Sequence, residues 1–312
     1  MGSEMCIRDR AFVPSGLGRP AGGAVLSPLG HGPPGVSLGV LGLVLLAAWA
    51  HAAWNLVAKG AQGGAAFVWL TTVASAVLYA PVLVGGIDLA PAAIALMAGS
   101  GALHAAYFVL LQRGYATGDL SLVYPLARGT GPLLSSVAAI AFLGEHPSPL
   151  AIAGAAVIVG AVFSLAGRPH GDATAAVVFA LLTGVAIAGY TLWDKQAVDG
   201  HGLDPLTYSW GTTLANLLCI TPWILLHRDR LALAWDTSRW RAVAVGLLSP
   251  TAYILVLYAL VRAPVSYVAP AGETSILLAT GLGLTVLGEG DARRRAMAAA
   301  AIVVGITLLA LG

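Results

Sequence analysis

Charge is scarce in this sequence, and its scarcity decides the class of protein. Only 10% of the 312 residues are Asp, Glu, Lys or Arg, while 58% are hydrophobic, and the mean hydropathy is +0.85. A soluble domain carries roughly 25% charged residues. The shortage therefore excludes a water-soluble globular protein and predicts an integral membrane protein. The formal net charge of +2 gives no sign of a nucleic-acid partner, and we expect none.

Cysteines and the motifs of several enzyme families are also missing. Cys6 and Cys219 are the only cysteines, and they suit neither a disulfide framework nor a metal site. We therefore expect no bound metal and no cofactor. The sequence has no Gly-x-x-x-x-Gly-Lys-Ser/Thr string to bind ATP and no Gly-x-Ser-x-Gly motif. Because Glu273 is the only acid expected deep in a span, an acid-dyad enzyme would lack its second carboxylate, and we expect no enzymatic activity.

Long apolar runs make up most of the chain. Each is about 20 residues long, enough to cross the hydrocarbon core of a bilayer as a helix. They predict an all-α integral membrane protein with ten transmembrane helices, at about residues 37–58, 65–86, 90–112, 119–143, 148–167, 173–195, 205–226, 240–261, 264–288 and 294–311. The longest connection is expected between His227 and Arg241, and it carries four arginines.

The first 35 residues do not continue this pattern. They are rich in Gly and Pro and lack the apolar segment of a signal peptide. The opening string MGSEMCIRDR resembles translated sequencing-adaptor sequence. We expect residues 1–35 to be a disordered tail that is not native, with the natural start later in the chain.

The two halves of the chain repeat the same patterns. A Trp-x-Thr-Thr string begins at Trp69 and again at Trp210, each followed at identical spacing by a proline. Residues 120–145 and 265–289 share a second pattern, in which Ser-x-Val-x-Pro leads into an apolar run closed by Leu-Gly-Glu. Five helices per repeat is an odd number, so the second repeat enters from the opposite side, as in inverted-topology transporters. The predicted repeats span residues 36–168 and 172–312.

One charge stands at the same place in each repeated stretch, three residues after the proline: Arg128 and Glu273. A charge at the centre of a membrane helix costs roughly 2.5–3.5 kcal/mol, so such residues usually face a cavity and pair. Each lies about eight residues into its helix, and helices entering from opposite sides should place them within about 6 Å in depth. The two charges are expected to form either a structural ion pair or a pair that binds substrate or a proton.

The same pattern in both halves, with the string His51-x-x-Trp54-Asn55-x-x-x-Lys59 in the first span, resembles the EamA-type transporters of the drug/metabolite transporter superfamily. The resemblance covers about residues 37–311. It implies ten helices around a central cavity lined by spans 1, 3, 4, 6, 8 and 9. It also implies the transport of amino acids, other metabolites or drugs.

Other polar residues extend the candidate site around the two charges. His51 and Asn55 share one face of the first span, and His104 and Tyr107 share one face of the third. For both histidines the alternative is a structural hydrogen bond to a neighbouring helix. The candidate substrate-binding residues are Arg128, Glu273, His51, Trp54, Asn55, His104, Tyr107, Tyr190 and Tyr253.

Several residues near span ends are interpreted structurally. Trp69 and Trp210 are expected in the interfacial aromatic belt, and Lys195 as an anchor that snorkels toward the headgroups. Glu145 is expected to satisfy backbone groups nearby. Small residues expected to allow close helix contact are Gly154, Gly160, Gly281, Gly283 and Gly305.

These features predict a secondary transporter that exports small metabolites, amino acids among them, across the plasma (bacterial inner) membrane by alternating access. Its expected partners are a small-molecule substrate, the lipid bilayer and a proton as coupling ion, exchanged by Glu273. Monomer and homodimer both stay open. The alternative function is a lipid-linked sugar flippase or a non-transporting membrane assembly factor. Orientation stays open too, because the bias of positive charges favours both termini outside, whereas the resemblance implies both inside.

Overall fold

The predicted all-α architecture is confirmed over the residues that the structure describes. The computed structural model describes residues 37–58, 61–86, 90–118, 120–166, 173–276 and 292–312, and these contain helices and no strand. The chain divides into two units, Met1–Pro33 and Pro34–Gly312, and all described residues belong to the second. The prediction of a disordered, non-native tail at residues 1–35 falls outside the described residues.

Ten α-helices and two short helical turns are present in the described ranges. They are α1 (Leu38–Ala58), α2 (Ala65–Leu78), η1 (Ala80–Gly85), α3 (Pro91–Thr117), α4 (Leu120–Phe142), α5 (Pro149–Ser164), α6 (Thr174–Lys195), η2 (Gln196–Gly200), α7 (Pro205–Leu226), α8 (Arg228–Leu260), α9 (Val265–Gly272) and α11 (Ala292–Leu311). In this part of the chain, six helical stretches are long and apolar enough to cross a membrane, and α5 and Ala296–Leu311 are shorter apolar helices. The end of the predicted span at 264–288 falls beyond the described residues.

Local sequence signals set where several helices begin. Proline stands at the start of α3, α5 and α7, where its missing N–H leaves no hydrogen bond unmade. Ser148 caps α5 by accepting a hydrogen bond from the backbone N of Ala151 at 3.0 Å. Asp204 caps α7 by accepting one from the backbone N of Thr207 at 2.9 Å. These caps satisfy donors that would otherwise be orphaned at the helix ends.

The prediction of a long loop between His227 and Arg241 is wrong. This segment is the first part of α8, which runs without a break for 33 residues. Ala234, Ser238 and Ala242 are buried, while the four arginines are exposed. The buried residues recur every four positions and therefore form the inner stripe of an amphipathic helix. The density of charge conceals this stripe when the sequence is scanned for apolar runs.

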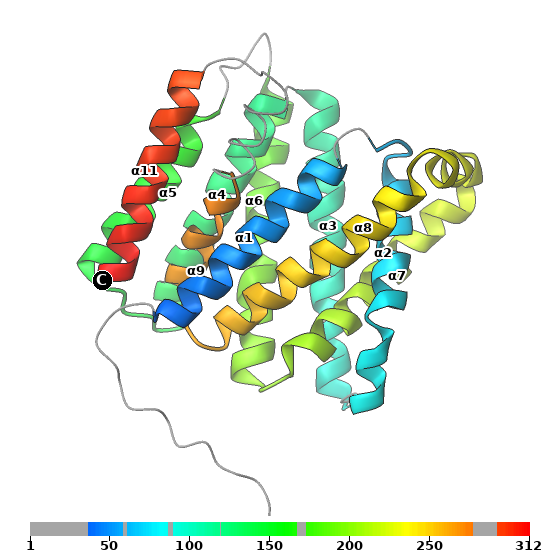
Figure 1. Ribbon diagram of the computed structural model, residues 1–312, viewed down its shortest axis with the longest axis horizontal. Helices are drawn as coiled ribbons and strands as arrows, with labels where there is room; N and C mark the ends of the chain where they lie inside the picture. The colour runs from blue at the N-terminus through cyan, green and yellow to red at the C-terminus, as the bar shows by residue number, and fades with distance from the viewer. Residues whose placement is uncertain (1–36, 59–60, 87–89, 119, 167–172, 277–291) are drawn as a thin grey trace, which may run out of the picture. The chain divides into compact units, whose positions relative to one another are not determined.

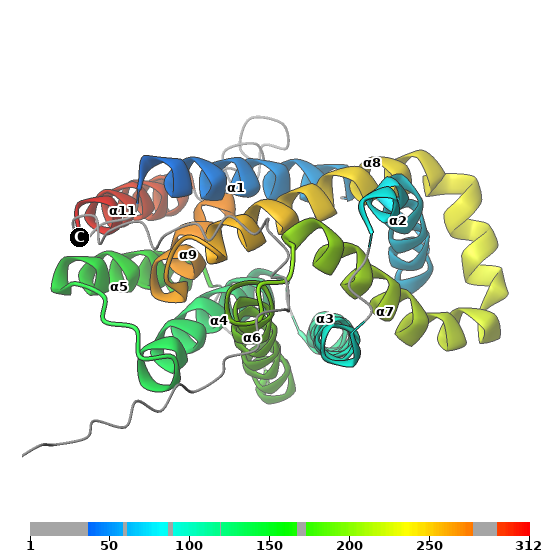
Figure 2. The same ribbon diagram turned by 90° about the horizontal axis from the view of Figure 1, so that it is seen from below.

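The helices of the two halves pack in matching pairs. α1 lies beside α8, and α6 lies beside α3 (Figure 1). α2 packs against α8 as α7 packs against α3, and α2 also packs against α7, α4 against α9 and α5 against α11. Figure 2 shows α1 and α8 on one side and α3 and α6 on the other, with α9 between α1 and α4. The short helix α9 is thus central to the packing of this unit.

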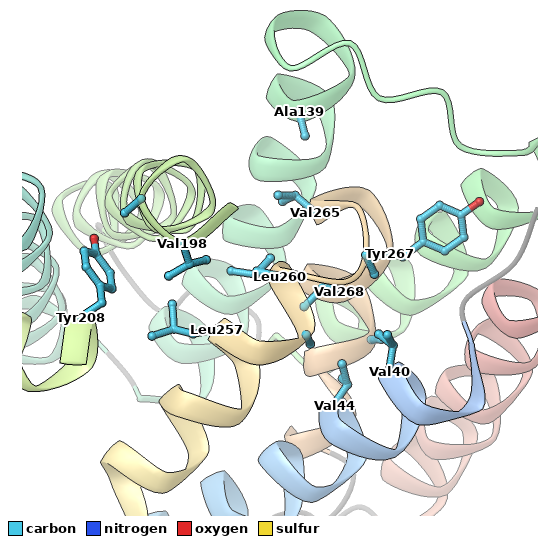
Figure 3. Close-up of a cluster of buried hydrophobic side chains, with 14 of the residues drawn as sticks. Val40, Val44, Ala139, Val198, Tyr208, Leu257, Leu260, Val265, Tyr267 and Val268 are labelled. Carbon is cyan, nitrogen blue, oxygen red and sulfur yellow. The ribbon is translucent and has the colours of Figure 1, made fainter. Parts of the chain in front are cut away.

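Among the described residues, the largest cluster of buried apolar side chains surrounds α9. Figure 3 shows Val265, Tyr267 and Val268 of α9 among Val40 and Val44 of α1 and side chains of α8. Val265 and Leu257 are fully buried, and Val268 is 3% exposed. This packing fixes α9, and with it the position of Glu273 at its end.

The indoles of Trp69 and Trp210 join α2 to α7, and their place in an interfacial aromatic belt stays a prediction. Trp210 Nε1 donates to the backbone O of Ala76 at 2.9 Å. Trp69 Nε1 donates to Thr221 Oγ1 at 3.0 Å, and that hydroxyl donates to the backbone O of Leu217. Leu217 follows Trp210 by the same seven residues that separate Ala76 from Trp69. The Leu217 carbonyl therefore matches the Ala76 carbonyl in the repeat, and Trp69 reaches it through the Thr221 hydroxyl.

Backbone contact between α5 and α11 depends on two glycines. A Cβ added to Gly154 would lie 2.6 Å from the backbone O of Gly305, and one added to Gly305 would lie 2.8 Å from the backbone O of Gly154. The prediction of close helix contact is thus confirmed for this pair. It is wrong for Gly160, where an added Cβ meets no atom within 4 Å. Gly281 and Gly283 fall outside the described residues.

Gly154→Ala should destabilise the protein by about 1–3 kcal/mol, because the added methyl group overlaps the backbone of α11. Gly160→Ala is the matched control, since it makes the same change on the same helix in open space. The control should be neutral or slightly stabilising. Thermal unfolding of the two purified variants in one detergent makes the comparison. Equal unfolding temperatures would show that this glycine contact does not hold α5 to α11.

Candidate functional site

Arg128 of α4 and Glu273 at the end of α9 form a two-pronged ion pair. Arg128 Nε donates to Glu273 Oε2 at 3.1 Å, and Arg128 Nη2 lies 3.0 Å from Glu273 Oε1. The side chains are only 16% and 5% exposed. Arg128 Nη2 also donates to Ser275 Oγ at 3.4 Å. The expected contact between these two charges is confirmed. Two contacts to one carboxylate suit the planar guanidinium.

Two prolines within α4 and the end of α9 lie close to the ion pair. Pro125 and Pro132 lie inside α4, before and after Arg128, and each removes a backbone donor from the helix. On the other side α9 ends at Gly272, Glu273 forms a turn, and helix resumes at Thr274. Interrupted helices near the site are a recurring feature of secondary transporters, because backbone groups freed there can meet a ligand.

Glu145 holds the start of α9 in place. Its Oε1 accepts a hydrogen bond from the backbone N of Val265 at 2.6 Å, and its Oε2 accepts one from the backbone N of Ser266 at 2.9 Å. A carboxylate at a helix N-terminus satisfies free N–H groups and favours the helix dipole. The interpretation of Glu145 as a partner for backbone groups is confirmed, and it ties the segment after α4 to α9.

The predicted residues of α1 interact with one another. Trp54 Nε1 donates to His51 Nδ1 at 2.9 Å, so Nδ1 is an acceptor and a neutral His51 carries its proton on Nε2. Asn55 Nδ2 donates to the backbone O of His51 at 2.7 Å. All three side chains are half-buried. His51 is therefore oriented from within its own helix.

The aromatic candidates form a connected group across α3, α6 and α8. The ring of His104 stacks on Tyr190 at 4.1 Å between centroids and meets Tyr253 edge-on at 5.3 Å. Tyr107 meets Tyr190 edge-on at 6.0 Å. His104 Nδ1 lies 2.9 Å from the backbone O of Ser100 and must donate to it, because a carbonyl only accepts. The structure thus brings these four candidates together.

Asp194 is a buried acid that the sequence analysis missed. It is 1% exposed and accepts three hydrogen bonds: to Oδ1 from Ser100 Oγ at 2.6 Å and from Tyr208 OH at 2.8 Å, and to Oδ2 from Tyr253 OH at 2.7 Å. Among the described residues, Asp194 is thus a second buried acid beside Glu273. Asp194 lies near the end of the span predicted at 173–195, but η2 (Gln196–Gly200) continues the helical turns beyond it.

Lys195 does not act as the predicted lipid anchor. Its Nζ donates to the backbone O of Leu260 at 2.6 Å and of Ala263 at 3.2 Å, and it pairs with Asp199 Oδ2 at 2.9 Å. It therefore caps the C-terminus of α8, where a cation is favoured by the helix dipole.

Comparison with known proteins identifies the second half of the chain. Residues 174–311 match the model of the EamA-like transporter family. This segment is an EamA-like transporter domain. The family is part of the drug/metabolite transporter superfamily, as the resemblance implied. Membership makes the protein a multi-pass membrane transporter.

A solved structure shares the fold over most of the chain. The crystal structure of a protein aligns with a TM-score of 0.70 at 17% sequence identity, covering 87% of this chain and 96% of that chain. At this identity the likeness concerns the fold. A search of curated proteins gives no match. Among the described residues, no three His, Cys, Asp or Glu side chains are grouped to hold a metal ion.

Removing one member of the Arg128–Glu273 pair should destabilise the protein more than removing both. Glu273→Leu leaves a buried guanidinium that cannot lose its proton and should cost about 3–5 kcal/mol. Arg128→Met should cost less, because the remaining carboxylate can take up a proton. The double variant Arg128→Met/Glu273→Leu should recover most of the stability.

Unfolding of the three variants in one detergent measures this difference. A double variant less stable than either single variant would contradict the expectation. It would show that attraction within the pair, rather than avoidance of a lone charge, holds α4 to α9.

Proposed function

We propose that this protein is a secondary transporter that exports small zwitterions, amino acids or similar metabolites, across the plasma (bacterial inner) membrane by alternating access. It acts without enzymatic activity. The observation that carries the proposal is the Arg128–Glu273 pair. It presents one charge of each sign, one from each half of the chain, at a break in α9.

The architecture that supports alternating access is a pair of inverted five-helix repeats, residues 36–168 and 172–312. The matching packing of α1 on α8 and α6 on α3 is what a two-fold relation would produce. The reciprocal indole contacts of Trp69 and Trp210 support the same relation. In such transporters the substrate site lies near the midplane between the repeats, and the repeats rock around it.

The chemistry of the pair favours a substrate with a carboxylate and an ammonium group. Arg128 would bind the carboxylate through its planar fork, which a lysine cannot copy. Glu273 would bind the ammonium. His51 and Trp54 of α1, with the aromatic group on α3, α6 and α8, would supply the walls, including faces suited to a cation. A bound zwitterion replaces one desolvated ion pair with two, so binding and separation of α4 from α9 are coupled.

The substrate class can be found by a thermal-shift screen of the purified protein against amino acids, other metabolites and cationic drugs. Arg128→Lys should then weaken binding of the best zwitterion about tenfold, which is ~1.4 kcal/mol. Arg128→Ala should nearly eliminate binding, because it removes the guanidinium that would bind the substrate carboxylate. Arg113→Ala, at an exposed arginine on α3, is the control and should bind as wild type. Undiminished zwitterion binding by Arg128→Ala would overturn the assignment.

Glu273→Gln should abolish accumulation of the amino acid driven by a pH gradient in proteoliposomes. Gln keeps the shape of the side chain and an oxygen acceptor for Arg128, but it removes the charge that would bind the ammonium. Circular dichroism should show an unchanged helix content. Asp236→Asn, at an exposed position of α8, is the control. Gradient-driven transport at the wild-type rate would exclude Glu273 from the transport site.

A further inference from the structure

A second buried acid in the described structure, Asp194, is fully hydrogen-bonded but is not part of the Arg128–Glu273 pair. Asp194 accepts hydrogen bonds from hydroxyls on three helices: Ser100 on α3, Tyr208 on α7 and Tyr253 on α8. No lysine, arginine or histidine of the described residues forms an ion pair with it. It differs in this respect from Glu273, whose two oxygens both engage Arg128.

This difference decides which carboxylate can accept a proton without disrupting the fold. Protonating Glu273 would leave the buried guanidinium of Arg128 without a counter-charge, at a cost of several kcal/mol. Protonating Asp194 removes a charge that has no ion-pair partner among the described residues from a low-dielectric interior, where such charges are disfavoured. The three hydroxyl donors favour the charged form of Asp194. The apolar surroundings therefore stabilise the protonated form and the hydroxyls stabilise the ionised form.

The hydroxyls around Asp194 can serve either form. A hydroxyl both donates and accepts, whereas an ionised carboxylate only accepts. A proton on Oδ2 would be donated to Tyr253 OH, while Ser100 and Tyr208 continue to donate to Oδ1. The hydrogen of Tyr253 could then turn toward Ser100 Oγ, 3.5 Å away. Only the bond between Asp194 and Tyr253 reverses its direction, and no heavy atom needs to move.

The occupant that fits this site is a proton rather than a metal ion. Both carboxylate oxygens are already engaged by hydroxyls at 2.6–2.8 Å. The hydrogens of those hydroxyls point at the carboxylate, so a cation bound there would have to displace them. Calcium and magnesium sites instead present several oxygens with free lone pairs to one point.

The Asp194 site is connected to the proposed substrate site through aromatic side chains. Tyr253, which binds Asp194, meets the edge of His104, and His104 stacks on Tyr190. Tyr190 lies one turn before Asp194 on α6, on the same face. The titratable groups that face Asp194 from its own helix and from the helices packed around it are His104, Tyr208, Tyr253 and Tyr190. Lys195, the next residue in the chain, pairs with Asp199 instead.

We propose that Asp194 is the proton-binding carboxyl of this protein, and that it, rather than Glu273, carries the proton that drives transport. The coupling part of this inference rests on the proposed transport function; the proton site itself does not. Ser100 belongs to the first half of the chain, and Tyr208 and Tyr253 belong to the second. Gain or loss of one proton therefore changes the hydrogen bonds between the two halves, which must move against each other during transport.

Infrared difference spectroscopy between acidic and alkaline buffer detects the proton directly, with the full chain reconstituted in liposomes. Wild type should show a protonated-carboxyl band that shifts when aspartate is labelled with carbon-13. Asp194→Asn should lose the band, and Glu273→Gln should keep it. A band that survives Asp194→Asn, or disappears only in Glu273→Gln, would overturn the proposal.

A second variant keeps the test valid if Asp194→Asn does not fold. Tyr253→Phe removes the hydroxyl whose role reverses but leaves the carboxyl in place, so the band should remain and shift in frequency. Tyr258→Phe, on the same helix beside Arg262, is the matched control and should leave the band unchanged. An identical spectrum for Tyr253→Phe and wild type would contradict the proposed site.

Transport of labelled L-alanine separates this inference from the proposed function. Asp194→Asn should retain counterflow exchange of alanine and lose accumulation driven by a pH gradient. Accumulation driven by a sodium gradient, or pH-driven accumulation in Asp194→Asn at the wild-type level, would overturn the coupling role. If wild type moves no amino acid but shows the Asp194 band, the proposed substrate class fails and the proton site stands.

Discussion

The structure depends on one constraint, that a charge inside a membrane needs a partner. Arg128 and Glu273 meet this requirement across the two halves of the chain, with both carboxylate oxygens engaged. The pair joins α4 to α9, and α9 is itself surrounded by the largest apolar cluster. Because a lone charge is costly in this environment, the helices can separate only if another ion takes the place of each partner. That requirement makes the ion pair a natural place for a zwitterionic substrate to enter.

The same constraint explains most of the polar contacts elsewhere. Glu145 satisfies the first N–H groups of α9, and Lys195 satisfies carbonyls at the end of α8. The indoles of Trp69 and Trp210 donate across the α2–α7 contact. These contacts lie at helix ends and between helices, where backbone and side-chain groups would otherwise lack partners. Asp194 is the exception, since its partners are neutral hydroxyls, and this exception separates it from the other buried charges.

The helices and the Arg128–Glu273 contact could be predicted from the sequence, because the length of apolar runs and the repetition of a pattern can both be seen in a single chain. The apolar runs predicted the helices, and the shared place of Arg128 and Glu273 in two matching stretches predicted their contact. Asp194 could not be found in this way, because the Asp-Lys dipeptide at an apparent span end looks interfacial, and only the helical turn η2 shows that the helix continues. The first part of α8 was missed because its buried stripe is made of Ala and Ser rather than large apolar residues. The indole contacts depend on which helices are neighbours, which a single sequence does not show.

The unbroken length of α8 has a consequence for any alteration of the chain. At about 1.5 Å per residue, 33 residues extend roughly 50 Å, well beyond a hydrocarbon core of about 30 Å. A connecting loop absorbs an inserted residue, but a continuous helix transmits it as a rotation of about 100° to everything that follows. Between Arg228 and Arg241, an added residue would therefore turn Tyr253 away from Asp194. A fusion partner or epitope tag placed in this arginine-rich segment, which looks like the obvious surface loop, would disturb the interior of the protein.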